Sequence, residues 1–307
     1  MKGLGIAKSR KSLGEAVRRI TFPLPEDQAT QGFKPPVYIR LLRKFAQLLI
    51  TLLRLNGVNR FSNEFIQALD PKLVVKLPNQ RKMVLRTGHG RLIWRARTFL
   101  EEEPMLIEWI NGFGPDDIFY DVGANVGCYS IYAAGQGIKT LAFEPELNNV
   151  QLLYENVFLN GLQETCIPIP IALGKQTGME VFYIKSISKG DALHSIGRKS
   201  YLLHDPSNVT TQIDTLVMKL DDAIKTFGLP QPTRLKVDVD YNELPVMQGA
   251  IETLKNVREV YVEIDPKLEE HLELVGFLEG LSFRVTDRLE TPRQWNNEIS
   301  NFLFTRD

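Results

Sequence analysis

Cysteine is scarce in this sequence. Only Cys128 and Cys166 occur among its 307 residues. Two cysteines so far apart match neither a disulfide framework nor the clustered spacing of a zinc site. This fits a reducing compartment, and we expect a cytoplasmic protein. Cys128 stands near a predicted helix start, where the pKa of a thiol can be lowered. Packing in the core is nevertheless the favoured interpretation for it.

Long apolar runs are also missing. The first residues, MKGLGIAKSRKSLG, lack the apolar core of a signal peptide. The most hydrophobic segment, residues 37–57, contains no run that approaches the roughly 20 apolar residues of a membrane span. Its polar residues fall three or four apart, which predicts an amphipathic helix with a basic stripe, ending at Asn56-Gly57. Such a helix can dock on the body or on a second subunit. Alternatively, it can bind peripherally to an anionic membrane.

The sequence has no net charge, but its two ends differ. Residues 1–60 contain twelve Lys and Arg against three Asp and Glu, a net charge of +9 that leaves −9 for residues 61–307. A basic arm on an acidic body indicates either an anionic partner, such as a membrane or nucleic acid, or an arm that folds back on its own body.

From about residue 106 the sequence alternates between strand-like runs and helical patterns. The predicted strands and helices, in order, are strand 118–121, helix 126–134, strand 140–144, helix 146–159, strands 166–173, 180–184 and 216–220, strand 233–240, helix 243–255, strand 259–264 and helix 267–279, before the closing runs SFRVTD and NFLFTR. This alternation predicts an α/β fold with a mostly parallel sheet and helices on both faces. Ligands of such sheets bind beyond the carboxyl ends of the strands.

The segment before this domain has a different pattern. Residues 73–94 contain short strand-like runs separated by the turn residues Pro78-Asn79 and Gly88-His89-Gly90. We therefore predict three parts: a basic N-terminal arm with an amphipathic helix (1–60), a small β-rich segment (61–105) and the main domain (106–307).

A glycine loop follows the first strand of the main domain. Its pattern is Asp121-x-Gly123-x-Asn125-x-Gly127. A dinucleotide site needs a further glycine, so that backbone N–H groups can meet a pyrophosphate, but Ala124 and Val126 fill the intervening positions. The leading carboxylate would also repel phosphate. The loop favours a ligand with a cationic end and no phosphate, such as S-adenosylmethionine.

Glu144 ends the second strand, seventeen residues after Gly127. A carboxylate at this point can accept two hydrogen bonds from ribose hydroxyls. This residue alone would fit NAD equally well, so the choice of cofactor rests on Asp121 and the glycine spacing.

Three blocks of the chain resemble the FkbM-type family of S-adenosylmethionine-dependent methyltransferases. They are FYDVGANVGCYSIYAA, LAFEPELNNVQLLYENVFLNGL and LKVDVDYNELPVMQGAIETL, within residues 104–265 or so. The resemblance implies a Rossmann-like class I methyltransferase fold and O-methylation of a sugar, lipid or secondary metabolite. It also implies a cofactor site that comprises Asp121, Gly123, Asn125, Gly127, Glu144 and Asn160, the last resembling the asparagine that closes the family's second helix.

The third block departs from the family pattern. The family normally has Asp-Val-(Asp/Glu)-Gly-(Asn/Ala)-Glu after the fourth strand, and this chain has Asp238-Val239-Asp240-Tyr241-Asn242-Glu243. Tyrosine thus replaces glycine where the strand opens toward the methyl acceptor. We expect Tyr241 to shape the acceptor pocket.

A hydroxyl acceptor has a high pKa, so its methylation calls for a base or a divalent metal. Asp238 and Asp240 alternate with apolar residues on a predicted interior strand, where unpaired charges are costly. We assign both to catalysis, with Glu263 as a third candidate metal ligand. The alternative is an ion pair between Lys236 and Asp238, with Asp240 capping the next helix. His194 and His204 lie in a polar insertion (186–212) that we expect to overhang the site. We interpret both histidines as surface residues rather than as catalytic bases.

Other functions compete with this one. The loop spacing argues against a dehydrogenase. A protein that binds S-adenosylmethionine with little activity is an alternative, because Tyr241 disturbs the acceptor-side motif. The basic arm suggests a nucleic-acid methyltransferase, but the body is acidic and the sequence lacks a base-stacking motif such as Asn-Pro-Pro-Tyr.

Overall fold

A computed structural model describes residues 37–55, 71–88, 90–186, 188–192, 194–197, 211–290 and 300–306. Helix α2 (Val37–Leu55) belongs to one unit of the chain, and the segments from residue 71 onward belong to another. The helix confirms the prediction for this segment, although its expected end at Asn56-Gly57 lies outside the described residues. None of the helices in the described ranges is long and apolar enough to cross a membrane.

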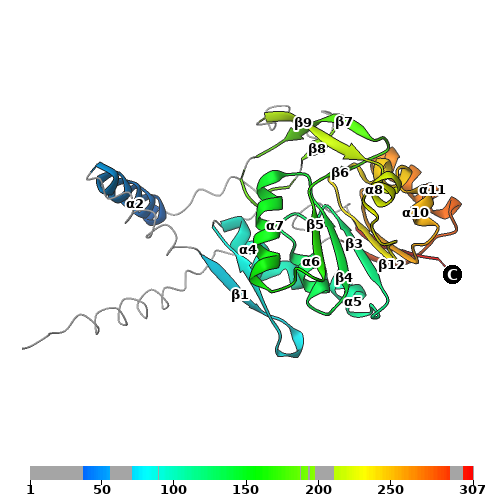
Figure 1. Ribbon diagram of the computed structural model, residues 1–307, viewed down its shortest axis with the longest axis horizontal. Coiled ribbons are helices and arrows are strands. Elements are labelled where there is room, and N and C mark those ends of the chain that lie inside the picture. The colour runs from blue at the N-terminus through cyan, green and yellow to red at the C-terminus, as the bar shows by residue number, and fades with distance from the viewer. Residues whose placement is uncertain are drawn as a thin grey trace, which may run out of the picture. The chain divides into compact units, whose positions relative to one another are not determined.

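The body is built on a seven-stranded sheet, counted over the described residues (Figure 1). Its order is β12 (Arg284–Glu290), β13 (Ser300–Thr305), β11 (Glu259–Ile264), β10 (Arg234–Val237), β3 (Ile118–Val122), β4 (Lys139–Phe143) and β5 (Cys166–Ile169). The strands from β11 to β5 run parallel, whereas β13 runs antiparallel to both of its neighbours. The last strand in the chain, β13, is inserted antiparallel between β11 and β12. This is the topology of the class I methyltransferase fold, which confirms the predicted fold class.

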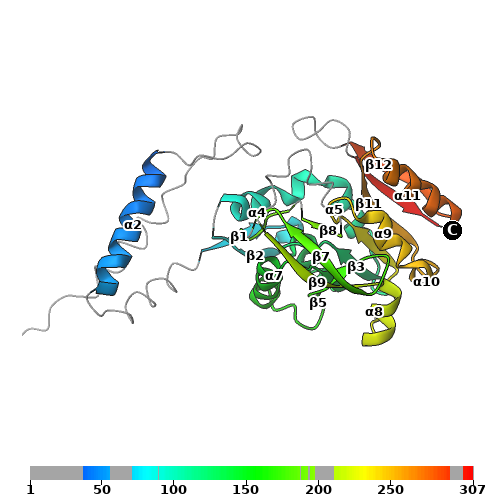
Figure 2. The same ribbon diagram turned by 90° about the horizontal axis from the view of Figure 1, so that it is seen from above.

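Helices cover both faces of this sheet. One face carries α4 (Gly90–Glu102), α5 (Pro104–Asn111), α6 (Cys128–Ala134) and α7 (Leu147–Leu159), and the other carries α8 (Leu220–Phe227), α9 (Glu243–Gln248), α10 (Ile251–Leu254) and α11 (Glu269–Gly280). Successive strand residues point to opposite faces, so Phe119 enters one apolar core and Tyr120 the other. Figure 2 shows β12 and α11 at one edge of the sheet and α7 toward the other.

Two smaller β structures flank the sheet. Strands β1 (Lys72–Lys76) and β2 (Lys82–Arg86) form an antiparallel hairpin around a 3-10 turn, η1 (Pro78–Gln80). The second is a four-stranded sheet of β6 (Ala172–Leu173), β9 (Thr211–Met218), β7 (Gly178–Ile184) and β8 (Ser195–Ile196), again within the described residues.

The expected strand at the end of 73–94 is wrong. Residues 91–94 lie in α4, which begins at Gly90. Leu92, Ala96 and Phe99 are all buried, and their spacing of three and four residues is helical. The consecutive apolar residues at 92–94 suggested a strand because a short apolar run does not reveal its period.

Two boundaries near the fourth parallel strand also differ from expectation. Strand β10 ends at Val237 rather than at 240, and the expected helix 243–255 divides into α9 and α10 at Gly249-Ala250. Asp240 and Tyr241 have φ of +51° and +76°. A strand cannot continue through two residues in the left-handed region. Asp238 and Asp240 therefore stand on a loop at the carboxyl edge of the sheet.

Candidate active site

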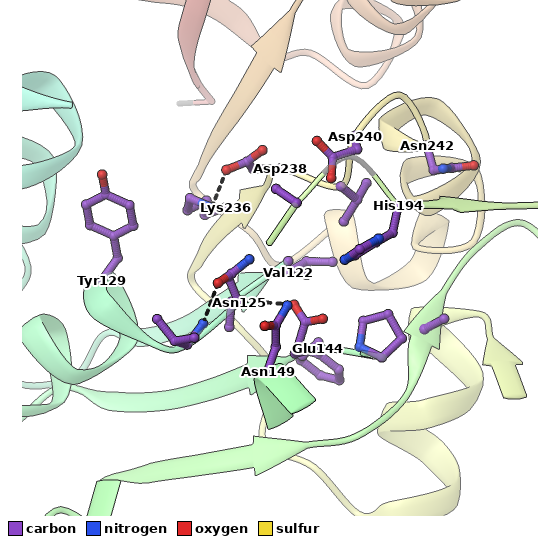
Figure 3. Close-up of a pocket in the computed structure, with 18 of the residues that line it drawn as sticks. Val122, Asn125, Tyr129, Glu144, Asn149, His194, Lys236, Asp238, Asp240 and Asn242 are labelled. Atoms are coloured by element: carbon purple, nitrogen blue, oxygen red, sulfur yellow. Dashed lines mark hydrogen bonds and ion pairs between the residues drawn. The ribbon is translucent and has the colours of Figure 1, made fainter. Parts of the chain in front are cut away.

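One cavity lies at the carboxyl ends of β3, β4 and β10, where a parallel sheet binds its ligands (Figure 3). Of the predicted site residues, Gly123, Asn125, Glu144, Asp238 and Asp240 line this cavity. The structure does not bring the others to its wall, namely Asp121, Gly127, Asn160, Tyr241 and Glu263.

The glycine loop owes its shape to close packing. Gly123 and Gly127 have φ of +84° and +86°, which favours glycine. A Cβ at Gly123 would collide with the carbonyl oxygen of Asp238, and one at Gly127 would collide with the side chain of Leu153 in α7. The two glycines thus let the loop approach the end of β10 on one side and α7 on the other.

Glu144 lies at the middle of the cavity wall. Its two carboxylate oxygens accept the N–H groups of Asn125 and Glu146, each at 2.9 Å, and its side chain is buried. Burial raises the pKa of Glu144 to about 7, although these two hydrogen bonds act in the opposite direction. Carboxylate oxygens have further lone pairs, so the group can still accept hydrogen bonds from a ligand.

Asp121 lies beneath the cavity. Its Oδ2 accepts the hydroxyl of Ser130 at 2.5 Å, and its Oδ1 is 3.4 Å from Nζ of Lys236. The same Nζ is 3.1 Å from Oδ2 of Asp238. Asp121 therefore acts on the cavity through Lys236, which lines the cavity and is fully buried.

One end of the cavity is densely charged. Arg95 and Glu102 from α4 and Glu103, the N-cap residue of α5, meet Lys236 and Asp238 there, beside the ring of Tyr129. Burial raises the pKa of Glu102 to about 7 and also raises that of Glu103, which accepts the hydroxyl of Tyr261 at 3.2 Å. Burial alone would lower the pKa of Lys236, but the neighbouring carboxylates raise it above its ordinary value. No sequence pattern indicates Arg95, Glu102 or Glu103, which precede the predicted domain.

The other end of the cavity is mainly apolar. It is lined by Phe143, Pro145, Ile171, Ala172, Leu173, Phe182 and Ile196, together with the imidazole of His194. Figure 3 shows His194 across the cavity from Tyr129 and Lys236, with Glu144 between the two ends. The cavity therefore changes from densely charged to mainly apolar along its length, with Asp240 and Asn242 as polar residues on the His194 side.

The described part of the polar insertion covers the cavity, as expected. The Asn125 amide donates to the carbonyl of Asp191 at 2.8 Å, and Asn149 accepts the N–H of Gly190 at 2.7 Å. Nε of Arg95 donates to the carbonyl of Gly190 at 2.9 Å. An ion pair of 2.6 Å joins Asp191 to Arg91. The side chain of Asn125 thus holds this cover segment in place.

The loop after β10 is braced from behind. Oε1 of Glu243 accepts the N–H groups of Val239 and Tyr241 at 3.1 and 3.3 Å, and its Oε2 is 3.0 Å from Nε2 of His271. The Tyr241 ring stacks on His271 with 6.2 Å between ring centroids. Tyr241 therefore packs beside the cavity wall. Sequence reasoning missed Glu243 and His271, which lie far apart in the chain.

The alternative interpretation of this loop had two parts, an ion pair between Lys236 and Asp238 and a helix cap by Asp240. The ion pair between Lys236 and Asp238 is present. Its second half does not hold, because Asn242 is the N-cap residue of α9 and Asp240 instead lines the cavity, partly exposed.

The candidate metal ligands do not form a metal site. Over the part of the chain that the structure describes, no group of three or more His, Cys, Asp or Glu is placed to hold a metal ion. Burial and the neighbouring Asp238, Glu243 and Asp240 raise the pKa of Glu263 well above its ordinary value.

The other residues singled out from the sequence are Asn160 and Cys128. Asn160 ends α7, where its amide donates to the carbonyl of Val84 at 2.7 Å and accepts the N–H of Val84 at 2.8 Å. It therefore ties the β1–β2 hairpin to α7, away from the cavity. Cys128 is buried in the core, as expected, and burial raises its pKa to about 12, but the residue also lines the cavity.

The fold and this cavity define a class I methyltransferase architecture. The model of the methyltransferase FkbM domain matches residues 121–285, more than half of the chain, and the protein belongs to this family of methyltransferases. The hexuronic acid methyltransferase AglP of Haloferax volcanii is 27% identical over 179 residues, which cover 57% of this chain and 69% of that protein. The 31-O-demethyl-FK506 methyltransferase FkbM of Streptomyces tacrolimicus is 26% identical over 192 residues, 56% of this chain and 74% of that protein.

A solved structure is also similar. It is the methyltransferase FkbM from Methylobacillus flagellatus, with 16% sequence identity and a TM-score of 0.43. The match covers 62% of this chain and 44% of that one, so this chain spans less than half of that protein.

Proposed function

We propose that the protein transfers a methyl group from S-adenosylmethionine to a hydroxyl oxygen of a sugar, lipid or secondary metabolite. The observation that carries this proposal is the polarity of the cavity. One end is charged, Glu144 occupies the middle, and the other end is apolar.

This order of groups matches the order of groups in S-adenosylmethionine. The amino-acid end of the cofactor carries both an ammonium and a carboxylate, which suit Glu103 and Arg95 at the charged end. The ribose hydroxyls suit the Glu144 carboxylate, and a purine suits the apolar end.

Asp240 is the candidate base. When bound, S-adenosylmethionine supplies an electrophilic methyl carbon whose C–S bond breaks as the acceptor oxygen attacks, with sulfur leaving as a neutral thioether. The carboxylate of Asp240 takes the hydroxyl proton as the new O–C bond forms. Asp238 and Asp240 both line the cavity, and we assign this role to Asp240. The walls of the cavity contribute by aligning the reactants.

The relatives support an oxygen acceptor. One is named for a hexuronic acid and the other for the 31-O position of FK506. We therefore propose a hydroxyl on a glycan or on a secondary metabolite as the first class of acceptor to test.

Two measurements test the function. Calorimetry should give micromolar binding of S-adenosylhomocysteine and no binding of NADH; the reverse preference would exclude the proposed cofactor. The purified protein should then transfer label from radiolabelled S-adenosylmethionine to glycan or lipid extracts, and the Asp240→Asn variant is the matched control. Label in an RNA extract alone would support the nucleic-acid alternative. Cofactor binding without transfer to any extract would support a protein of little activity.

A further inference from the structure

Among the residues that the structure describes, one ring nitrogen of His194 has no hydrogen-bond partner. The side chain is 8% exposed and lines the cavity. Its Nδ1 accepts the N–H of Lys185 at 3.2 Å. Burial lowers the pKa of His194, so the ring is neutral. In a neutral imidazole whose Nδ1 is an acceptor, the proton is on Nε2. His194 therefore presents an N–H donor.

This donor is exceptional among the described residues. Five buried side-chain nitrogen or oxygen atoms there lack a hydrogen bond, and four of them belong to ion pairs: those of Arg86 with Glu155, of Arg234 with Asp117, and of Asp121 with Lys236. The fifth is Nε2 of His194. A buried donor without a partner costs about 1–3 kcal/mol, and a ligand that supplies an acceptor recovers this cost.

The position of the ring indicates which part of a ligand it meets. Phe182, at the apolar end, packs edge-to-face against it with 5.7 Å between centroids. The charged groups with the largest effect on its pKa are Glu146 in the segment after β4, Asp191 in the insertion, Lys185 directly after β7 and Arg91 in α4. His194 thus faces the apolar end beside Glu144.

We propose that Nε2–H of His194 donates a hydrogen bond to a ring nitrogen of the purine of S-adenosylmethionine. This inference rests on the proposed function. Purine ring nitrogens are acceptors, whereas the exocyclic amine of adenine is a donor, so a fixed N–H donor sets the orientation of the base. His194 is not a base toward the methyl acceptor, because Nε2 already holds its proton and Nδ1 is engaged by Lys185.

The first experiment measures the affinity of S-adenosylhomocysteine for three proteins by calorimetry. His194→Phe keeps a planar ring but removes the donor, and should weaken binding by about three- to tenfold, the value of one neutral hydrogen bond. His194→Gln keeps an N–H donor near the position of Nε2 and should stay within about twofold of the wild type. An unchanged affinity in His194→Phe overturns the proposal.

The second experiment varies the ligand on the wild-type protein, so that it does not depend on the folding of a variant. The 1-deaza, 3-deaza and 7-deaza analogues of S-adenosylhomocysteine each lack one ring nitrogen. One of these analogues should bind the wild type about three- to tenfold more weakly than S-adenosylhomocysteine does. The same analogue and S-adenosylhomocysteine should bind His194→Phe with equal affinity. Equal binding of all three analogues and the parent compound by the wild type overturns the proposal. If the wild type does not bind S-adenosylhomocysteine at all, the proposed function itself fails.

Discussion

The loops after β3 and after β10 leave neighbouring strands at the same edge of the sheet, yet they reach their shapes differently. In the first, glycine occupies two of the three left-handed positions, and the N–H groups of Gly123 and Ala124 donate to the carbonyl of Phe143 at 3.0 Å. In the second, Asp240 and Tyr241 occupy left-handed positions without glycine.

The difference separates two tasks. The first loop is relaxed and matches the cofactor pattern of the family. The second is held by Glu243 and His271 in a conformation that L-residues resist, and such strain persists only where the surroundings impose it. We therefore expect changes in the first loop and its neighbour Glu144 to act on cofactor affinity, and changes in the second to act on turnover and stability.

The largest expected effect is on turnover. Asp240→Asn should reduce it by about 10²–10⁴-fold, because the amide cannot accept the hydroxyl proton. Asparagine tolerates left-handed backbone as well as aspartate does, so the loop should keep its shape. S-adenosylhomocysteine affinity should stay within about twofold. Asp238→Asn is the matched comparison, and normal turnover in Asp240→Asn would transfer the role of base to Asp238.

The next effect is on cofactor affinity. Glu144→Ala should weaken S-adenosylhomocysteine binding by about 1.5–3 kcal/mol, the range for hydrogen bonds to a charged group. Glu155→Ala, on the next helix and paired with Arg86, is a control that should leave affinity unchanged. Calorimetry on both variants measures the difference. An unchanged dissociation constant in Glu144→Ala would mean that the ribose binds elsewhere.

Affinity should also depend on pH. Burial raises the pKa of Glu144 to about 7. Ribose hydroxyls donate best to the ionised carboxylate, so affinity should increase as pH rises toward and above this value. Near pH 6 it should be lower by up to about tenfold, because roughly a tenth of the groups are then ionised. Glu144→Gln should flatten this dependence, and an equally steep profile in that variant would assign it to another group.

The same pKa shift predicts the stability of the ligand-free protein. Between the ordinary value of 4.5 and about 7, folded Glu144 holds a proton that the unfolded chain has released. Stability therefore falls as pH rises through this window and levels off above it. Thermal unfolding at about pH 5 and about pH 8 should show a smaller difference in Glu144→Gln. Glu102, whose pKa burial also raises to about 7, should account for a second part of the slope.

The two loops also differ in how far the sequence predicts them. The β3 loop depends on local spacing, and Asp121, Gly123 and Gly127 are enough to place a tight turn between a strand and a helix. The end of β10 could not be predicted from local spacing. The apolar alternation through Val239 suggests a strand, but a contact of Glu243 with His271 from α11 fixes the loop.

The missed parts of the cavity have a common cause. Arg95 lies in a helix whose first apolar residues read as a strand, and Glu103 follows that helix, both ahead of the predicted domain. His194 reads as a surface residue because its insertion is polar. It is buried because Asn125 and Asn149 hold that insertion over the cavity. Side chains that reach a site by tertiary packing leave no periodic signal in the sequence.

The smallest effect isolates the strain in the β10 loop. Tyr241→Gly and Tyr241→Ala both remove the ring that stacks on His271, and any change in acceptor preference due to the ring should appear in both. Only glycine removes the Cβ from a backbone with φ of +76°. Tyr241→Gly should therefore be more stable than Tyr241→Ala by about 1 kcal/mol in denaturant unfolding. S-adenosylhomocysteine affinity should stay within about twofold, or ~0.4 kcal/mol, in both variants, because Tyr241 does not line the cavity. Equal stabilities of the two variants would mean that the loop backbone relaxes once the ring no longer stacks on His271. A loss of S-adenosylhomocysteine affinity greater than twofold would mean that the β10 loop also contributes to cofactor binding.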